Sequence, residues 1–158
     1  MNLLDMIKID EGFSATPYVD SEGYVTIGYG WKVSNKGADK SLFCLTVTET
    51  SDAFRLNEDI NMRIARMKRE MSLDLALTAC MDSPARYAGL VSMSYQLGIS
   101  GVNQFKKMLS AAIAHDWEGM KNHALDSKWA SQTPNRAKRI SGMFGSGEWD
   151  SYYLNSES

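Results

Sequence analysis

Apolar side chains recur at helical spacing in the first turns of the chain, at Leu3, Leu4, Met6 and Ile7. Asp10 and Glu11 follow them, and Gly12 is a residue type that commonly ends a helix. We therefore predict a short amphipathic helix from about Asn2 to Glu11, with Glu11 at its end.

The pattern becomes typical of strands between Tyr18 and Trp31. β-Branched and aromatic residues stand there on both sides of the turn sequence Asp20-Ser21-Glu22-Gly23. This segment predicts a β-hairpin. Residues 34–47 show no periodicity and are expected to form an irregular loop.

Helical periodicity dominates the rest of the chain. Thr48 has the character of an N-cap, and apolar residues at steps of three and four predict one long helix from Glu49 to about Arg69. Further helices are expected to begin at three pairs of a capping residue and a suitable first helical residue, namely Ser83-Pro84, Asp116-Trp117 and Thr133-Pro134. The segment from Tyr87 to Leu97 is apolar nearly all round, which predicts the buried centre of a helical lobe.

These elements predict an α+β fold, in which a long helix joins a small lobe built on the hairpin to a larger all-helical lobe. The length of 158 residues fits one domain, and a hydrophobic content of 44% is enough to bury a core without disulfides or metal. We expect a cleft between the two lobes.

Composition excludes several classes of protein. The apolar stretches are too short for a membrane span and the first residues lack the features of a signal peptide, so we expect a soluble cytoplasmic product. Cys44 and Cys80 are then expected to be free thiols. His115 and His123 have no neighbouring cysteine pair and are interpreted as surface residues, and neither a metal ion nor another cofactor is expected.

The formal net charge of -2 argues against a dedicated nucleic-acid binder, because such proteins normally carry a strong basic excess. The charge is unevenly distributed, however. The stretch from Ser127 to Arg139 contains four basic residues and no acidic one. It is compatible with a surface that faces an anionic polymer, although an ordinary solvated basic face is the commoner explanation of such a stretch.

Glu11, Asp20 and Thr26 are the candidates for chemistry. Cleavage of a glycosidic bond needs one carboxylic acid to protonate the leaving oxygen and a second carboxylate to activate water or stabilise the developing positive charge. Glu11 closes a helix and Asp20 begins a turn, so both are expected at the edge of the small lobe. The hydroxyl of Thr26, on the returning strand, can hold a water beside Asp20. The same residues also fit purely structural roles, as a solvated helix end, an Asx turn and a β-former.

Two widely separated blocks of sequence resemble phage lysozymes of the T-even coliphage type, which are glycoside hydrolase family 24 endolysins. The first block has the family's glutamate, aspartate and threonine in order and spacing, within Ile9-Asp10-Glu11-Gly12, Pro17-Tyr18, Asp20, Glu22-Gly23-Tyr24 and Thr26-Ile27-Gly28-Tyr29-Gly30. The second block comprises Tyr95-Gln96-Leu97-Gly98, Gly101-Val102, Phe105, Trp117, Trp129, the run from Gln132 to Arg139, and Trp149-Asp150. The resemblance covers essentially the whole chain.

The resemblance implies a lysozyme-like fold and a division of the chain. The expected parts are a single lysozyme domain over 1–158, with a small β lobe at 13–47, a connecting helix at 48–70, and a helical lobe made of 71–158 together with 1–12. It further implies that Glu11 is the general acid, that Asp20 acts on water or the developing cation, and that Thr26 positions the water. The family's outcome is inversion, which requires the two carboxyls to be roughly 6.5 to 9.5 Å apart.

The resemblance also implies a set of substrate-binding residues, namely Gly30, Lys32, Tyr95, Gln96, Met108, His123 and Arg136. Arg136 corresponds to an arginine that reaches toward the acid, yet a nearby cation lowers a carboxyl pKa whereas a general acid needs a raised one. Burial therefore has to compensate, or the pair has to loosen when substrate binds. For Tyr95 and Gln96 the alternative, a core aromatic residue and its capped neighbour, stays open.

Several positions depart from the family's pattern. Trp31 and Lys32 replace a histidine and an apolar residue, which alters the mouth of the expected cleft. Met108 and His123 preserve neither a small nor an amide group, so the resemblance does not define the substrate preference. The loop between Val33 and Thr48 is short, and we expect no full helix there. The acidic net charge predicts weaker attraction to an anionic cell wall than in basic relatives.

The function implied is that of a muramidase, which hydrolyses the β-1,4 bond between N-acetylmuramic acid and N-acetylglucosamine in peptidoglycan for host cell lysis by a phage. Bacterial peptidoglycan is then the partner of a monomer that binds no nucleic acid and has no stable membrane association. It would stay in the host cytoplasm until a membrane pore made by another protein admits it to the wall.

Two alternatives stay open. One is a lysozyme that opens the wall as a phage infects a cell, and the lack of an extra domain counts against it. The other is a catalytically inactive peptidoglycan-binding module. The joint presence of Glu11, Asp20, Thr26 and Arg136 counts against this second alternative, because binding alone needs neither an acid nor a base.

Overall fold

A computed structural model of the chain describes residues 1–157. The chain forms two compact units: Leu4–Asn61, and Met1–Leu3 together with the residues from Met62 onward. We call them the sheet unit and the helical unit. The predicted grouping of residues 1–12 with 71–158 differs from this division, because most of the first helix belongs to the sheet unit. The rings of Phe13 and Tyr29 lie 5.1 Å apart and attach the end of that helix to the sheet.

The sheet unit begins with helix α1 (Leu3–Glu11), which confirms the predicted helix. It buries Met6 and Ile7, and Gly12 ends it with a φ of +66°. The left-handed backbone at this position explains why a glycine stands there.

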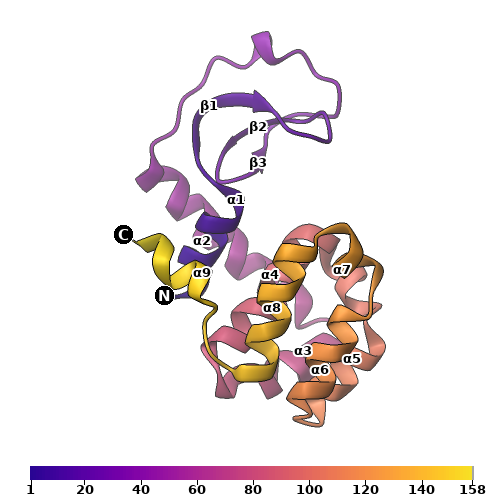
Figure 1. Cartoon of the computed structure of the whole chain (residues 1–158). Coiled ribbons are helices and arrows are strands. Elements are labelled where there is room, and N and C mark those ends of the chain that lie inside the picture. The colour runs from indigo at the N-terminus through magenta and orange to yellow at the C-terminus, as the bar shows by residue number, and fades with distance from the viewer. Residues whose placement is uncertain (158) are drawn as a thin grey trace. The chain divides into compact units, whose positions relative to one another are not determined.

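The predicted hairpin is confirmed as β1 (Ser14–Val19) and β2 (Val25–Gly28), which pair antiparallel with Tyr18 opposite Thr26. A third strand, β3 (Trp31–Lys32), extends the sheet in the order β1-β2-β3 (Figure 1). This strand was not predicted, because only two residues form it. Between Phe43 and Thr48 the loop has no regular structure, and the segment before it holds only the short 3-10 helix η1 (Lys40–Leu42), so the absence of a full helix there is confirmed.

The long helix α2 (Glu49–Met67) follows, and the Thr48 hydroxyl caps it by accepting a hydrogen bond from the Ser51 N–H at 3.1 Å. The helix ends before the predicted Arg69. A tight turn over residues 68–70 then leads into α3 (Met71–Ala79), which continues the same apolar spacing and was not predicted as a separate helix.

The helical unit contains the remaining helices: η2 (Cys80–Asp82), α4 (Pro84–Asn103), α5 (Lys106–Ile113), α6 (Trp117–Leu125), α7 (Lys128–Gln132), α8 (Pro134–Ser146), α9 (Ser151–Leu154) and η3 (Asn155–Glu157). Helix α6 packs against α5 and α8, and α4 packs against α8 (Figure 1). The predicted starts at Pro84, Trp117 and Pro134 are confirmed. Ser83 and Asp116 cap their helices through their side chains, whereas the Thr133 hydroxyl instead donates to the Trp129 carbonyl at 3.1 Å.

Helix α4 supplies the centre of the helical core. Residues 88–94 are all buried, with Leu90, Val91 and Met93 fully covered, which confirms the expected buried segment except at Tyr87 and at its C-terminal end. Gly98 interrupts the helix with φ +69° and ψ 166°. Tyr95 and Gln96 therefore lie in the last turn before a break in the helix, where their side chains are partly or largely exposed.

The two cysteines differ in their exposure to solvent. Cys44 is exposed, Cys80 is buried, and both are free. Among the helices of residues 1–157, none combines the length and the apolar character that crossing a bilayer demands.

Candidate active site

Asp20 is held rigidly in the turn between β1 and β2. Its Oδ1 accepts hydrogen bonds from the backbone N–H groups of Glu22 and Tyr24, both at 2.9 Å. The Asp20 N–H in turn donates to the Tyr24 carbonyl at 2.9 Å. This is the Asx arrangement expected of an aspartate in a turn, but it occupies only one of the two carboxylate oxygens.

The second oxygen of Asp20 faces groups that suit catalysis. Oδ2 lies 3.3 Å from the Thr26 hydroxyl and 3.7 Å from the Lys32 ammonium. Thr26 is 2% exposed, and its hydroxyl also lies 3.3 Å from the Tyr24 carbonyl. The backbone hydrogen bond from Tyr24 is the largest of the effects that lower the pKa of Asp20. Desolvation opposes it, and Glu22, Lys32 and Thr26 lower the pKa further. Asp20 is therefore ionised at neutral pH, as a group acting on water or on a cation has to be.

Lys32 contributes a cation to this corner of the sheet. Its ammonium pairs with Glu22 and lies 4.4 Å from the centroid of the Tyr24 ring. The hydrogen bond to Glu22 raises the pKa of Lys32, which therefore stays charged beside Asp20. The resemblance implied that Lys32 binds substrate, whereas its neighbours in the structure also make it part of the environment of the Asp20 carboxylate.

Glu11 lies against the backbone of Gly30. A Cβ atom on Gly30 would stand 2.8 Å from Glu11 Oε2, and the φ of this glycine is +68°. Any other residue at position 30 would therefore collide with the carboxylate and also strain the backbone. The pKa of the Tyr18 phenol is raised, first by burial and then by the negative charges of Asp20 and Glu11. Both carboxylates are thus close enough to Tyr18 to influence its charge state, and the sequence did not predict Tyr18 as a site residue.

A buried ion pair fixes the backbone next to Gly30. Asp52, on α2 and 2% exposed, accepts a hydrogen bond from the Tyr29 N–H at 2.5 Å. Arg55 donates to both oxygens of Asp52 and also to the Tyr29 carbonyl at 3.3 Å. A Cβ atom on Gly28 would overlap the Asp52 carboxylate, so this glycine makes the approach possible. Sequence reasoning assigned Asp52 only to the first turn of its helix, although its spacing of four from buried Leu56 was a usable signal.

The helical unit holds the other predicted substrate-binding residues. Gln96 Oε1 accepts a hydrogen bond from Trp129 Nε1 at 2.8 Å, which orients the amide. Arg136 Nη2 donates to the Ser92 hydroxyl at 2.9 Å. The Tyr95 ring is covered by the guanidinium of Arg63 at 4.0 Å. These polar partners show that Tyr95 and Gln96 are not simply core residues.

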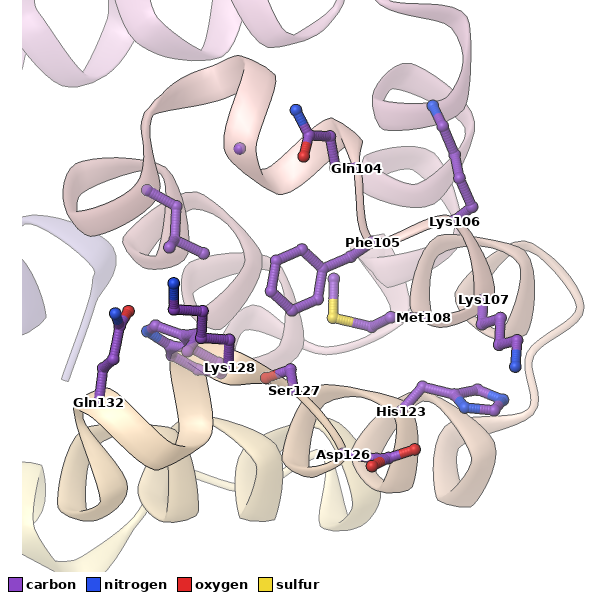
Figure 2. Close-up of a pocket in the computed structure, with 13 residues that line it drawn as sticks. Gln104, Phe105, Lys106, Lys107, Met108, His123, Asp126, Ser127, Lys128 and Gln132 are labelled. Atoms are coloured by element: carbon purple, nitrogen blue, oxygen red, sulfur yellow. The ribbon is translucent and has the colours of Figure 1, made fainter.

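Met108 and His123 line a pocket of about 570 Å³, which we call the Phe105 pocket (Figure 2). The Phe105 ring lies near its middle and meets Trp129 edge to face at 6.4 Å. Met108 is 1% exposed and supplies little contact surface, whereas His123 is exposed. The structure thus brings Glu11, Asp20, Thr26, Gly30 and Lys32 together in the sheet unit. It brings Met108 and His123 to one pocket of the helical unit, beside the Trp129 that binds Gln96.

Comparisons with known proteins show which family this chain resembles. The chain is 28% identical over 172 residues to the pre-baseplate central spike protein Gp5 of Enterobacteria phage T4, covering 96% of the chain but 29% of that protein. It is 26% identical to the probable T4-type lysozyme 2 of Dictyostelium discoideum, covering 96% of the chain and 98% of that relative. A third relative, the peptidoglycan hydrolase gp36 of Pseudomonas phage phiKMV, is 28% identical over 81% of the chain and 13% of its own length.

The family model of phage lysozyme matches residues 8–144. That range contains Glu11, Asp20 and Thr26 with their surroundings in the sheet unit, and it extends into α8 of the helical unit. Both blocks of resembling sequence fall within it, apart from Trp149-Asp150. The chain therefore belongs to the phage lysozyme family.

Proposed function

We propose that this protein is a muramidase, which hydrolyses the β-1,4 bond between N-acetylmuramic acid and N-acetylglucosamine in bacterial peptidoglycan. The observation that carries the proposal is the pairing of an ionised Asp20 with the Thr26 hydroxyl at its second oxygen, in the same unit as Glu11. The names of two relatives, a T4-type lysozyme and a peptidoglycan hydrolase, support the same substrate.

The chemistry requires two carboxyl groups with opposite tasks. In the proposed mechanism Glu11 donates its proton to the glycosidic oxygen as the bond to the anomeric carbon breaks. Thr26 holds a water through its hydroxyl, Asp20 accepts a proton from that water, and the water oxygen bonds to the anomeric carbon. Attack from the face opposite the leaving group inverts the configuration, as expected when the carboxyls are roughly 6.5 to 9.5 Å apart.

The substrate-binding residues of the helical unit are part of the same proposal. Gln96, oriented by Trp129, offers a fixed amide to a sugar or peptide group. His123 presents an exposed imidazole in the Phe105 pocket, while nearly buried Met108 serves mainly to shape that pocket. Tyr95 and Arg136 complete the proposed set. The cleft between lobes stays a prediction.

The biological role follows from the substrate. We favour host cell lysis by a monomer that waits in the host cytoplasm and reaches the wall through a pore made by another protein. A wall-opening role during infection is the second candidate, because one relative is a central spike protein of a phage. The inactive binding module is the third candidate, and it does not account for an ionised aspartate beside a hydroxyl.

A turbidity assay on chloroform-treated Gram-negative cells tests the proposal. Glu11→Gln and Asp20→Asn are each expected to abolish lysis, because one cannot donate the proton and the other cannot accept it. Glu58→Gln removes an exposed carboxylate from α2 and serves as the matched control, with wild-type activity expected. Binding of the unaltered protein to cell walls without release of new reducing ends would overturn the enzyme assignment in favour of the binding module.

A further inference from the structure

A second pocket of the helical unit has four cations among the nine residues that line it. It has a volume of about 820 Å³, and its charged lining residues are Arg63, Arg66, Arg69, Lys106 and Glu70. Arg63 and Arg66 come from the last turns of α2, Arg69 from the turn that follows, and Lys106 from the start of α5. We call this the arginine pocket.

Arg63 forms a rigid part of this pocket. Its Nη1 donates to the Ser94 carbonyl at 2.8 Å, and its guanidinium covers the Tyr95 ring. Its Nε is buried, and no hydrogen-bond partner for this atom exists among residues 1–157. The guanidinium is thus oriented by a carbonyl and an aromatic ring, and no carboxylate of the described chain neutralises it. Its positive charge is available to a ligand.

The single acidic residue of the pocket is already engaged. Glu70 accepts a hydrogen bond from Asn103 Nδ2 at 3.0 Å, and Asn103 Oδ1 accepts one from Lys106 at 3.2 Å. Arg66 and Arg69 are exposed, and neither forms an ion pair with any residue of the described chain. Two guanidinium groups therefore face solvent without a counter-charge.

The excess of cations is a property of one half of the molecule. The sheet unit, Leu4–Asn61, has ten acidic and five basic residues, whereas the rest of the chain has nine acidic and twelve basic ones. The overall charge of -2 hides this difference. An anionic polymer is thus attracted to the helical unit and repelled by much of the sheet unit.

The arginine pocket adjoins the Phe105 pocket. Gln104 and Lys106 line both, and the Phe105 pocket adds Lys107 and Lys128 to its own lining (Figure 2). The cations of the two pockets thus come from the end of α2, the start of α5 and the start of α7, and Asp126 is an acidic residue in the lining of the Phe105 pocket. A polymer that reaches the Phe105 pocket meets the arginine pocket next to it.

We propose that the arginine pocket binds carboxylate groups of peptidoglycan stem peptides, in addition to the glycan contacts made during cleavage. The inference rests on the proposed function, which supplies the polymer. Stem peptides repeat along each glycan strand and carry free carboxylates. The arginine pocket can therefore bind one stem peptide while the adjoining Phe105 pocket contacts the next part of the same strand. Guanidinium groups bind carboxylates through paired hydrogen bonds, and Arg66 and Arg69 have no internal partner for this geometry.

Binding to purified, insoluble peptidoglycan sacculi tests the proposal. The measurement uses the Glu11→Gln background, so that the sacculi are not degraded. Arg66→Gln combined with Arg69→Gln is expected to weaken binding roughly five-fold at low ionic strength, since two solvent-exposed ion pairs are lost. Raising the salt concentration should abolish the difference. The matched control, Lys40→Gln with Lys68→Gln, removes the same charge from exposed positions outside the pocket and should bind like the parent.

Chemically amidated sacculi identify the ligand. Blocking the stem carboxylates should reduce binding of the parent to the level of the double arginine variant and leave that variant unchanged. Equal binding by the parent and the double variant would overturn the proposal, as would a loss seen equally in the lysine control. Binding of the parent to vesicles that contain lipopolysaccharide, together with unchanged binding to amidated sacculi, would assign the pocket to phosphate and also overturn it.

Hydrolysis of peptide-free glycan strands separates this proposal from the proposed function. The double arginine variant with Glu11 intact should cleave them at the parent's rate, because such strands have no stem peptides. If the parent fails to cleave them and also fails to lyse cells, the muramidase assignment fails while the sacculus-binding result still stands. If both proteins cleave them but bind sacculi equally, only the pocket assignment fails.

Discussion

At the scale of single residues, the candidate site depends on two positions where backbone and side chain constrain each other. Gly30 leaves room for the Glu11 carboxylate, and the turn amides hold one oxygen of Asp20. Each carboxylate is thus positioned by neighbours within the sheet unit. Changes to these neighbours are expected to alter activity more than stability.

Gly30→Ala is expected to abolish most of the activity, because the new Cβ would displace the Glu11 carboxylate. It should also destabilise the protein by about 1 to 3 kcal/mol, since the residue has a left-handed backbone. Gly37→Ala is the matched control, because Gly37 has a φ of +80° with open space around its Cα. The control should have a lower melting temperature, because its backbone is strained in the same way, but it should lyse cells at the normal rate. Similar activity in both variants would show that Gly30 does not position the acid.

The pH dependence of stability should reveal the environment of Asp20. Its pKa in the folded protein lies below the ordinary value of 3.8, so its ionisation stabilises the fold above that value. This contribution is lost as the pH falls through the lowered pKa. Asp20→Asn should therefore be less stable than the wild type at neutral pH, and the difference should shrink in acid. Melting temperatures across pH 2 to 7 measure it, and a constant difference would contradict the assignment.

The two thiols should react at very different rates. Burial raises the pKa of Cys80 to about 12, so its reactive thiolate is scarce, whereas Cys44 is exposed. A thiol reagent should label one cysteine of the native protein quickly and the second only after denaturation. Cys44→Ser should eliminate the fast phase. Reducing agent should leave the melting temperature unchanged, and a large drop would reveal a disulfide.

At the scale of elements, the connection between β2 and β3 depends on α2. Asp52 and Arg55 lie one turn apart on that helix and bind the N–H and the carbonyl of Tyr29. The third strand is only two residues long, so its own ladder contributes little to holding this connection. The ion pair therefore sets the position of Gly30, and through it the space that Glu11 occupies.

Asp52→Ala should destabilise the protein by about 3 kcal/mol, the low end of the range for breaking a buried pair, because Arg55 keeps some exposure to solvent. Catalytic turnover should fall further than the loss of folded protein explains, since the Tyr29 backbone loses its acceptor. Denaturant unfolding and initial lysis rates, compared with Glu58→Gln, measure both effects. Combining the change with Arg55→Met should recover stability but not activity. Full recovery of both would limit the pair to a structural role.

Capping residues predicted three helix starts, but the caps that Ser127 provides for α7 and Asp150 for α9 were missed. Ser83, Asp116 and Thr133 each precede a confirmed helix, whereas α5 follows Phe105, which makes no side-chain capping bond. Helix α3 was missed for another reason. Its apolar residues continue the spacing of α2, so the periodicity did not reveal the turn that separates them.

At the scale of the whole molecule, charge is divided between the units. The acidic sheet unit carries the candidate catalytic residues, and the basic helical unit carries the arginine pocket. The net charge predicted weak electrostatic attraction to an anionic wall, although the sequence also contains a basic stretch from Ser127 to Arg139. The uneven distribution changes this expectation, because attraction acts through local fields within about 8 to 10 Å at moderate salt.

Lysis should accordingly slow as the ionic strength rises, even though the net charge of the protein is negative. Initial rates of turbidity loss between low and physiological salt measure this dependence, with cleavage of peptide-free glycan as the salt-insensitive reference. Rates that rise with salt would mean that repulsion between the sheet unit and the wall dominates. They would contradict the prediction that the helical unit attracts the wall.

The sequence by itself determined the α+β class, the hairpin, the main helix starts and the family, because these depend on local spacing, capping residues and the order of a few functional side chains. It also identified Glu11, Asp20 and Thr26 as candidates. Only the tertiary structure revealed the contact of Glu11 with Gly30, the Asp52–Arg55 ion pair that binds the Tyr29 backbone, and the arginine pocket. These features join residues from separate elements, and the distances between such residues depend on packing that no local pattern encodes.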